Sequence, residues 1–195
     1  STHEATWYPY YSSSVFGMHT PQTKHPEDLT WATKDYANFQ VYALREGIDS
    51  NITKFILTGS NYGSLELAVP LTSSWFRDVY TDSKWNFAVR VKPAQQPLAT
   101  LVHGTSGSWN NPRYDVEFYG LNMAGDVIQN QFIATSSVKK KNIRDFLSSP
   151  KRMYVGSHYT NFTSSLQTRS DIRIKSLRVW TDYLSDEAIK AHAKD

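Results

Sequence analysis

The chain has 195 residues and a formal net charge of +3, and 14% of its residues are aromatic. This length suits one domain that buries roughly 70% of its unfolded surface. The absence of cysteine excludes disulfide frameworks, thiolate metal sites and cysteine nucleophiles. Six basic residues and one acidic residue lie close together, so the remainder of the chain is slightly acidic, and we expect a solvated basic segment and no nucleic-acid partner. These residues are Lys139, Lys140, Lys141, Arg144, Asp145, Lys151 and Arg152.

The beginning of the chain has no basic region followed by an apolar run, and no window approaches the length of a membrane span. We therefore expect no membrane insertion, and a soluble chain that is a mature form or an excised domain. Residues 1–28 are rich in Tyr, Ser, Pro and His without a sustained period. They predict an irregular lead-in, with a first short strand at residues 15–17, to a single domain that spans residues 1–195.

Alternation of apolar and polar residues predicts a series of short strands through the rest of the chain. Pro70 indicates that one of them ends there or lies at a sheet edge, because proline donates no ladder hydrogen bond. A Gly-containing turn at residues 122–126 predicts a hairpin, and a short helix is expected near residues 142–147, before Pro150. The predicted strands cover residues 38–44, 53–58, 65–71, 84–92, 98–103, 114–119, 127–135 and 151–155.

Residues 170–194 give the clearest local pattern of the chain. Residues 172–180 predict one strand, and a change of apolar phase at Lys175 and Ser176 indicates a β-bulge. Ser185 then predicts a helix cap, because acidic residues follow it in the first turn and Leu184 is placed to pack on Ile189.

The fold class that these patterns predict is all-β, with two antiparallel sheets packed as a sandwich and one short C-terminal helix. Residues 156–168 are expected to form a loop. Asn86, Arg90 and Lys92 are expected to face solvent. The residues expected in the interior are Trp85, Phe87, Val89, Val91, Val116, Phe118, Val155 and Leu177.

Four segments resemble laminin G-like domains of the concanavalin A-like lectin/glucanase superfamily. They are IKSLRVW at 174–180, LSDEAI at 184–189, SSPKRMYVG at 148–156 and WNFAVRV at 85–91. These segments also resemble the versions of this domain found in large structural proteins of phages or virions. The resemblance implies a jelly-roll sandwich, and it names no ligand.

The superfamily includes glucanases, which act through paired carboxylates. The strand motif E-x-D-x-x-E is absent, and the nearest arrangement is Asp115-Val116-Glu117, which places two carboxylates on one strand face. We expect this pair to be an ordinary solvent-facing one, and the chain not to be an enzyme. The alternative is a glycan-cleaving hydrolase that uses Asp115 and Glu117.

Two loops, at residues 103–113 and 156–162, combine aromatic rings with amides and hydroxyls, the mixture that binds sugars. The same residue types are common in ordinary loops. The leading interpretation is a non-catalytic module for recognition or adhesion, or a structural or decoration domain of a larger assembly such as a virion. We expect it on an extracellular or particle surface, with a glycan or another protein of its parent assembly as partner. The candidate ligand-binding residues are Trp109, Asn110, Asn111, Arg113, His158, Tyr159 and Asn161.

No pair of histidines has the spacing of a zinc site, and no cofactor is required by any motif. Some laminin G-like domains bind calcium through Asp and carbonyl oxygens, so the resemblance implies Asp78, Asp82 and Asp126 as calcium candidates. An Asp in a turn more often forms a hydrogen bond with its own backbone, so the sequence does not decide whether calcium binds.

Overall fold

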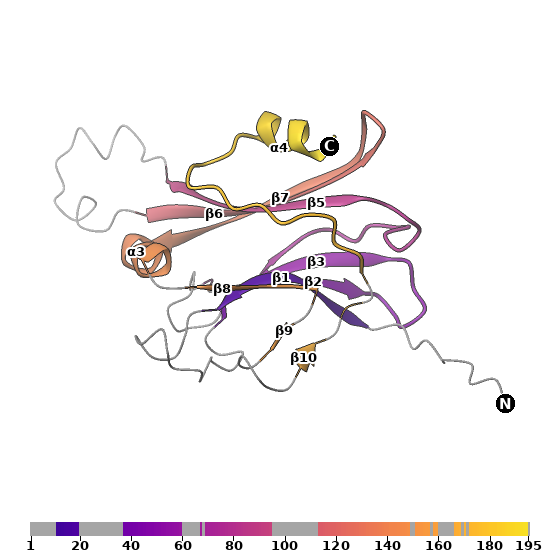
Figure 1. Ribbon diagram of the computed structural model, residues 1–195, viewed down its shortest axis with the longest axis horizontal. Helices are drawn as coiled ribbons and strands as arrows, with labels where there is room; N and C mark the ends of the chain where they lie inside the picture. Colours follow the sequence, from indigo (N-terminus) through magenta and orange to yellow (C-terminus); the bar gives the residue numbers. More distant parts are fainter. Residues whose placement is uncertain are drawn as a thin grey trace.

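Two antiparallel sheets face each other in the computed structural model of the chain (Figure 1). The five-stranded sheet has the order β4-β3-β2-β1-β8, and the three-stranded sheet has the order β5-β6-β7. A third, two-stranded ladder, β10-β9, lies against β1 and β8. The structure describes residues 11–19, 37–59, 67, 69–94, 113–148, 151–156, 158–159, 166–168, 170 and 172–194.

Most of the strands and both helices that the sequence predicts are present where the chain is described. The strands are β1 (Ser12–His19), β2 (Ala37–Arg45), β3 (Thr53–Thr58), β4 (Leu71–Thr72), β5 (Trp85–Pro93), β6 (Arg113–Ala124), β7 (Val127–Lys139), β8 (Arg152–Val155), β9 (His158–Tyr159) and β10 (Leu166–Thr168). The helices are α3 (Lys140–Ser148) and α4 (Asp186–Ala193). The expected strand at 98–103 lies outside the described residues.

The three-stranded sheet is built around the predicted hairpin. β6 and β7 pair from Arg113 opposite Lys139 to Ala124 opposite Val127. Gly125 has a φ of +59° at the turn, a conformation that glycine adopts without a steric cost. β5 pairs antiparallel with β6 along its whole length, so all three strands share one twisted surface.

Aromatic side chains join the two sheets. The Phe55 ring of β3 has its centroid 4.6 Å from that of Phe87 and 4.8 Å from that of Trp85, both on β5. Phe132 of β7 stacks on the same ring at 6.1 Å. The expected inward set of β5 is confirmed, because its alternate apolar residues pack against this core. The buried core consists of Val15, Phe39, Val41, Ala43, Phe55, Leu57, Leu67, Leu71, Val116, Phe118, Val138, Ile143 and Phe146.

The outer face of the three-stranded sheet is covered at β6 by α4, which Figure 1 shows on the side away from the other sheet. Ile189 and Ala193 of the helix form a second apolar cluster with Tyr119 and Leu121 of β6. The predicted cap is confirmed, since the Ser185 hydroxyl accepts a hydrogen bond from the Ala188 amide at 3.2 Å. The outward side chains of Tyr119 and Leu121 on β6 are therefore buried, and the sequence alone did not indicate this.

Residues 172–180 do not form the predicted bulged strand. They are extended but paired in no described ladder, and their side chains after Ile172 are exposed. Leu177 is 41% exposed and Val155 is 37% exposed, so these two core predictions are wrong. Alternation shows that a segment suits a strand, whereas a ladder also needs a sheet edge to pair with.

Two more predictions change. Residues 12–19, expected to be mostly irregular, form β1, which lies between β2 and β8 in the larger sheet. The expected loop at 156–168 contains β9 and β10. The local pattern of β1 is weak because two polar residues, Ser13 and Ser14, are buried next to Val15. The strand therefore shows no clean alternation of apolar and polar residues.

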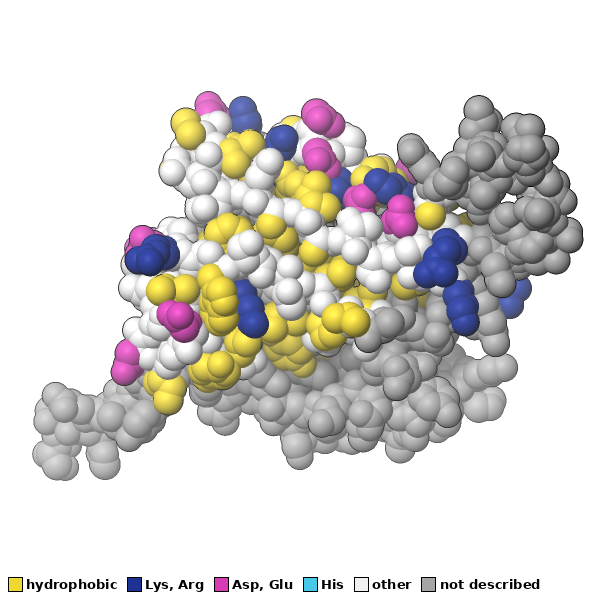
Figure 2. Space-filling model, turned by 180° about the vertical axis from the view of Figure 1, so that it is seen from behind, with side chains coloured by type: hydrophobic (Ala, Val, Ile, Leu, Met, Phe, Trp, Pro, Cys, Tyr) yellow, Lys and Arg dark blue, Asp and Glu magenta, His cyan; other side chains and the backbone are white. Residues whose placement is uncertain are grey.

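The surface in Figure 2 shows basic and acidic side chains at several separate places, with hydrophobic side chains between them. This view has no continuous field of one charge across the described residues. The mixed pattern agrees with a basic pI that arises from one segment.

Candidate functional site

The predicted sugar-binding residues divide between described and undescribed parts of the chain. Trp109, Asn110, Asn111 and Asn161 lie outside the described residues, as do the side chains of His158 and Tyr159. Arg113 begins β6, and its guanidinium donates to the Ser137 hydroxyl at 2.8 Å and to the Ser137 carbonyl at 3.0 Å. This is a cross-strand contact with β7.

The backbone of His158 and Tyr159 forms β9, which lies against the five-stranded sheet, whereas Arg113 belongs to the three-stranded sheet. The two predicted loops therefore attach to different sheets. The described residues do not bring them together as one site.

The three calcium candidates belong to two different loops. Asp126 sits in the β6–β7 turn and pairs with Lys194 at 3.2 Å. Asp78 and Asp82 both have positive φ, near +57° and +59°, in the loop before β5. Among the described residues, no three His, Cys, Asp or Glu side chains gather in a way that would hold a metal ion.

Glu117, half of the candidate catalytic pair, is only 6% exposed, which corrects the expected solvent-facing role. Its carboxylate contacts the Arg90 guanidinium at 2.8 Å and the Lys92 ammonium. The Tyr183 hydroxyl donates to it at 2.9 Å. Arg90, expected to face solvent, is likewise buried.

Arg90 connects this carboxylate to the C-terminal helix. One guanidinium nitrogen donates to the Asp186 carboxylate at 2.6 Å and to the Leu184 carbonyl at 2.9 Å. The same group lies over the rings of Tyr119 and Tyr183, at 5.2 Å and 4.9 Å from their centroids. The cluster thus attaches the first turn of α4 to β5 and β6.

The environment holds the Glu117 carboxyl in its charged form. Burial by itself raises its pKa, but hydrogen bonds from Lys92 and Tyr183 and the charge of Arg90 outweigh burial, so the pKa lies below its ordinary value. A glycosidase acid needs a raised pKa and a proton to donate. The oxygens of Glu117 are instead occupied as acceptors, so this geometry favours a structural role.

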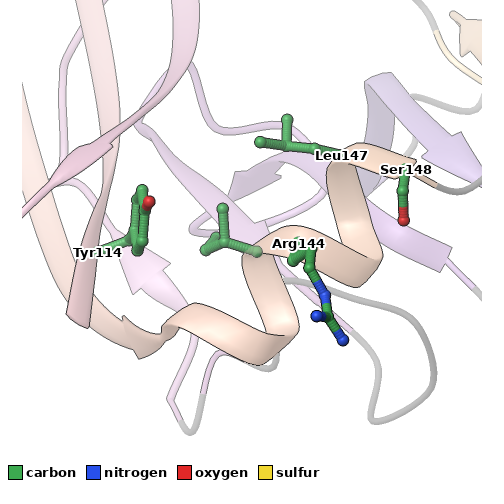
Figure 3. A pocket seen from close by; sticks show the side chains of 5 residues that line it. Tyr114, Arg144, Leu147 and Ser148 are labelled. Carbon is green, nitrogen blue, oxygen red and sulfur yellow. The ribbon is translucent and has the colours of Figure 1, made fainter. Parts of the chain in front are cut away.

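An apolar groove of about 380 Å³ lies between β6 and α3 (Figure 3). Tyr114 of β6 faces Ile143 and Leu147 of the helix across it. In Figure 3 the Arg144 side chain extends away from Tyr114. The groove offers few groups that would orient a ligand.

The second hollow is polar and lies at one end of the inner face of the three-stranded sheet. The cross-strand row of Phe87, Gly120 and Phe132 belongs to the aromatic core. One row further along, Trp85 pairs with Asn122, which pairs with Asn130. Alternation places both rows on the same face. The apolar core thus gives way to amides beside one tryptophan.

The loop before β5 completes this polar hollow, whose volume is about 250 Å³. Its hydroxyls are fixed by the loop itself: Thr81 donates to the Asp78 carbonyl and Ser83 to the Val79 carbonyl, both at 2.8 Å. The Asn122 amide donates to the Lys84 carbonyl at 2.9 Å. The lining residues are Arg77, Asp78, Thr81, Ser83, Trp85, Asn122, Gln129 and Asn130.

No protein-family model, curated protein or solved structure matches this chain. The site must therefore be judged by its own chemistry. No helix among the described residues is long and apolar enough to cross a membrane.

The sequence contained a partial signal for the polar hollow. The polar connection before β5 and the amides beside the hairpin turn are both visible in it. Their convergence depends on which residues stand opposite each other, and a register shift between Asn122 and Met123 helps to set that pairing. Register across three strands is not readable from one strand at a time.

Proposed function

We propose that this chain is a non-catalytic β-sandwich module for recognition or adhesion, and that its ligand is a glycan. The observation that carries the proposal is the polar hollow, where Trp85 lies in one row with the amides of Asn122 and Asn130. Sugars are bound by apolar surface together with a few fixed hydrogen-bonding groups. The hollow supplies both at one end of a sheet.

The state of Glu117 favours binding over hydrolysis. A hydrolase at Asp115 and Glu117 would need one carboxyl to give a proton to the leaving group. Glu117 has a lowered pKa and contacts Arg90, Lys92 and Tyr183, beneath the segment that leads into α4. Hydrolysis by Asp115 and Glu117 would first require this cluster to open.

For the fold, we propose that the two sheets form a concanavalin A-like jelly roll of the laminin G-like kind. Support comes from two facing antiparallel sheets and from three of the four resembling segments, which contribute β5, β8 and the capped start of α4. The fourth segment, residues 174–180, forms no described strand. In this proposal the chain acts on an extracellular or particle surface, and needs no cofactor. The proposal allows calcium to bind at the loops that hold Asp78, Asp82 and Asp126, and a glycan array with and without calcium tests this.

A glycan array probed with the purified chain, with and without calcium, tests the function. We expect binding to at least one glycan, and Asn130→Ala should weaken it at least tenfold. Gln131→Ala is the matched control, because Gln131 is the next residue of β7 and is exposed. If the unaltered chain binds no glycan, a structural or decoration role replaces recognition. Cleavage of a glycan that Glu117→Gln abolishes would instead establish the hydrolase.

A further inference from the structure

The charges at the polar hollow nearly cancel. Arg77 is the one cationic side chain of its lining and Asp78, the next residue, is the one anionic side chain. The nearby Lys84 ammonium donates to the Ala193 carbonyl at the end of α4, at 3.0 Å. A site for a carboxylate or phosphate group usually presents an excess of positive charge. This lining has none.

The hydrogen-bonding groups of the hollow suit hydroxyl groups. Thr81 and Ser83 already donate their protons to the loop, which leaves their oxygens free to accept. Asn122 uses one amide N–H on the Lys84 carbonyl and keeps a second N–H and its oxygen. A ligand hydroxyl both donates and accepts, so it can satisfy acceptors and donors that stand close together.

The size and rigidity of the hollow suit one small ring. Its volume of about 250 Å³ is below the ~300–1,000 Å³ of pockets for drug-sized ligands. Trp85 is held in place by neighbouring rings, because Phe55 lies 4.8 Å from it and Phe87 stacks on it at 6.0 Å. The apolar wall therefore needs no rearrangement when a ligand enters.

We propose that this hollow binds a single uncharged sugar ring and discriminates against the corresponding acidic sugar. The inference rests on the proposed function, since it specifies the ligand class of the same site. The amides of Asn122 and Asn130 and the hydroxyl oxygens of Thr81 and Ser83 bind the sugar hydroxyls, and Trp85 contacts its apolar edge. A carboxylate at the ring would find no net positive charge, because Arg77 and Asp78 cancel. It would also meet hydroxyl oxygens that can only accept, so it would bind more weakly than a neutral ring.

The experiment is an NMR titration of the ¹⁵N-labelled chain with the methyl glycosides of glucose, galactose and mannose, and with the methyl glycosides of the three corresponding uronic acids. The reporters are the indole N–H of Trp85, assigned with Trp85→Phe, and the side-chain amides of Asn122 and Asn130. We expect saturable shifts with at least one neutral glycoside and at least tenfold weaker binding of the uronide with the same ring. Asn130→Ala should weaken binding at least tenfold, and Gln131→Ala should leave it unchanged.

The outcomes separate the two proposals. If no neutral glycoside shifts the three reporters, or if a uronide binds as well as its neutral counterpart, the inference about the hollow is wrong. Glycan binding on the array would then still support recognition at another site. If the hollow binds a neutral glycoside while the array is negative, the inference holds and the adhesion function fails.

Discussion

The carboxylate of Glu117 has partners on two strands and on the closing segment. Arg90 and Lys92 reach it from β5, and Tyr183 reaches it from the residues before α4. A buried ion pair adds little compared with a well-packed apolar replacement, but removal of one partner leaves the other charge buried without compensation. The role of Glu117 is therefore best measured by removing its charge while its shape is kept.

Glu117→Gln should lower the free energy of unfolding by ~1–3 kcal/mol, because the Arg90 guanidinium loses a charged acceptor inside the protein. Urea denaturation at pH 7 measures this. Asp126→Asn is the control, since Asp126 is 82% exposed in its pair with Lys194 and such surface pairs contribute at most ~1 kcal/mol. Equal losses in both variants would mean that the buried cluster has no special role.

Stability should also depend on pH through this residue. Burial opposes the charged form, but the partners of Glu117 lower its folded pKa below the ordinary value of 4.5. The unfolded chain then binds this proton more readily, so the stabilisation is complete above the unfolded pKa and is lost as pH falls through the folded pKa. In urea titrations the difference between the unaltered chain and Glu117→Gln should shrink between pH 6 and pH 3. A difference that grows in acid would contradict the assignment.

Gly120 leaves room for the Phe132 ring on the neighbouring strand. A Cβ at this position would lie 2.1 Å from Cε1 of the Phe132 ring, which covers it. Gly120→Ala should therefore destabilise the chain by ~1–3 kcal/mol through overpacking of the core. At Gly47 the nearest atom to an added Cβ is 4.0 Å away, so Gly47→Ala serves as the matched control in thermal denaturation. A Gly120→Ala variant as stable as Gly47→Ala would show that the Phe132 ring moves aside freely.

At the scale of an element, α4 is a short helix that depends on its attachments. It has eight residues, and an isolated helix of this length is not stable in water. Its start is fixed by the Ser185 cap and by Asp186, which pairs with Arg90. Its apolar side is fixed by Ile189 and Ala193 against the sheet. Cap, ion pair and burial all act on the same two turns.

Ser185→Ala should lower stability by ~0.5–2 kcal/mol, because the Ala188 amide loses its acceptor. Lys190→Ala, further along the same helix, should change stability by less than ~0.5 kcal/mol. Chemical denaturation of both variants checks this. If the two substitutions have equal effects, the cap does not hold the helix in place.

At the scale of the whole molecule, there are two candidate binding regions. The polar hollow lies at the end of the three-stranded sheet, and Trp109 of the sequence-predicted loop lies outside the described residues. Their contributions are separable by mutation.

If the hollow is the site, Asn130→Ala should weaken glycan binding at least tenfold, and Trp109→Ala should change it less than threefold. The physical reason is that the hollow already contains its own aromatic side chain, Trp85, and its own amides. Binding isotherms of both variants against the best array glycan decide this. A tenfold loss with Trp109→Ala, without a comparable loss of stability, would return the site to the 103–113 loop.

The sequence by itself determined the local structure. Alternation predicted the β-rich class, the β6–β7 hairpin and the inward set of β5, and the residues around Ser185 predicted the start of α4. These features depend on neighbours in the chain, so one strand or one helix turn contains the whole signal. The failed strand at 172–180 has the same origin, because alternation says nothing about a partner.

Only the tertiary structure decided what each face meets. β6 presents Glu117 to one side and Phe118 to the other, and both are buried, because α4 covers one side and the second sheet covers the other. The polar hollow likewise depends on the register that places Trp85, Asn122 and Asn130 in one row. Such contacts join residues far apart in the chain, and their energy depends on geometry that no local pattern encodes.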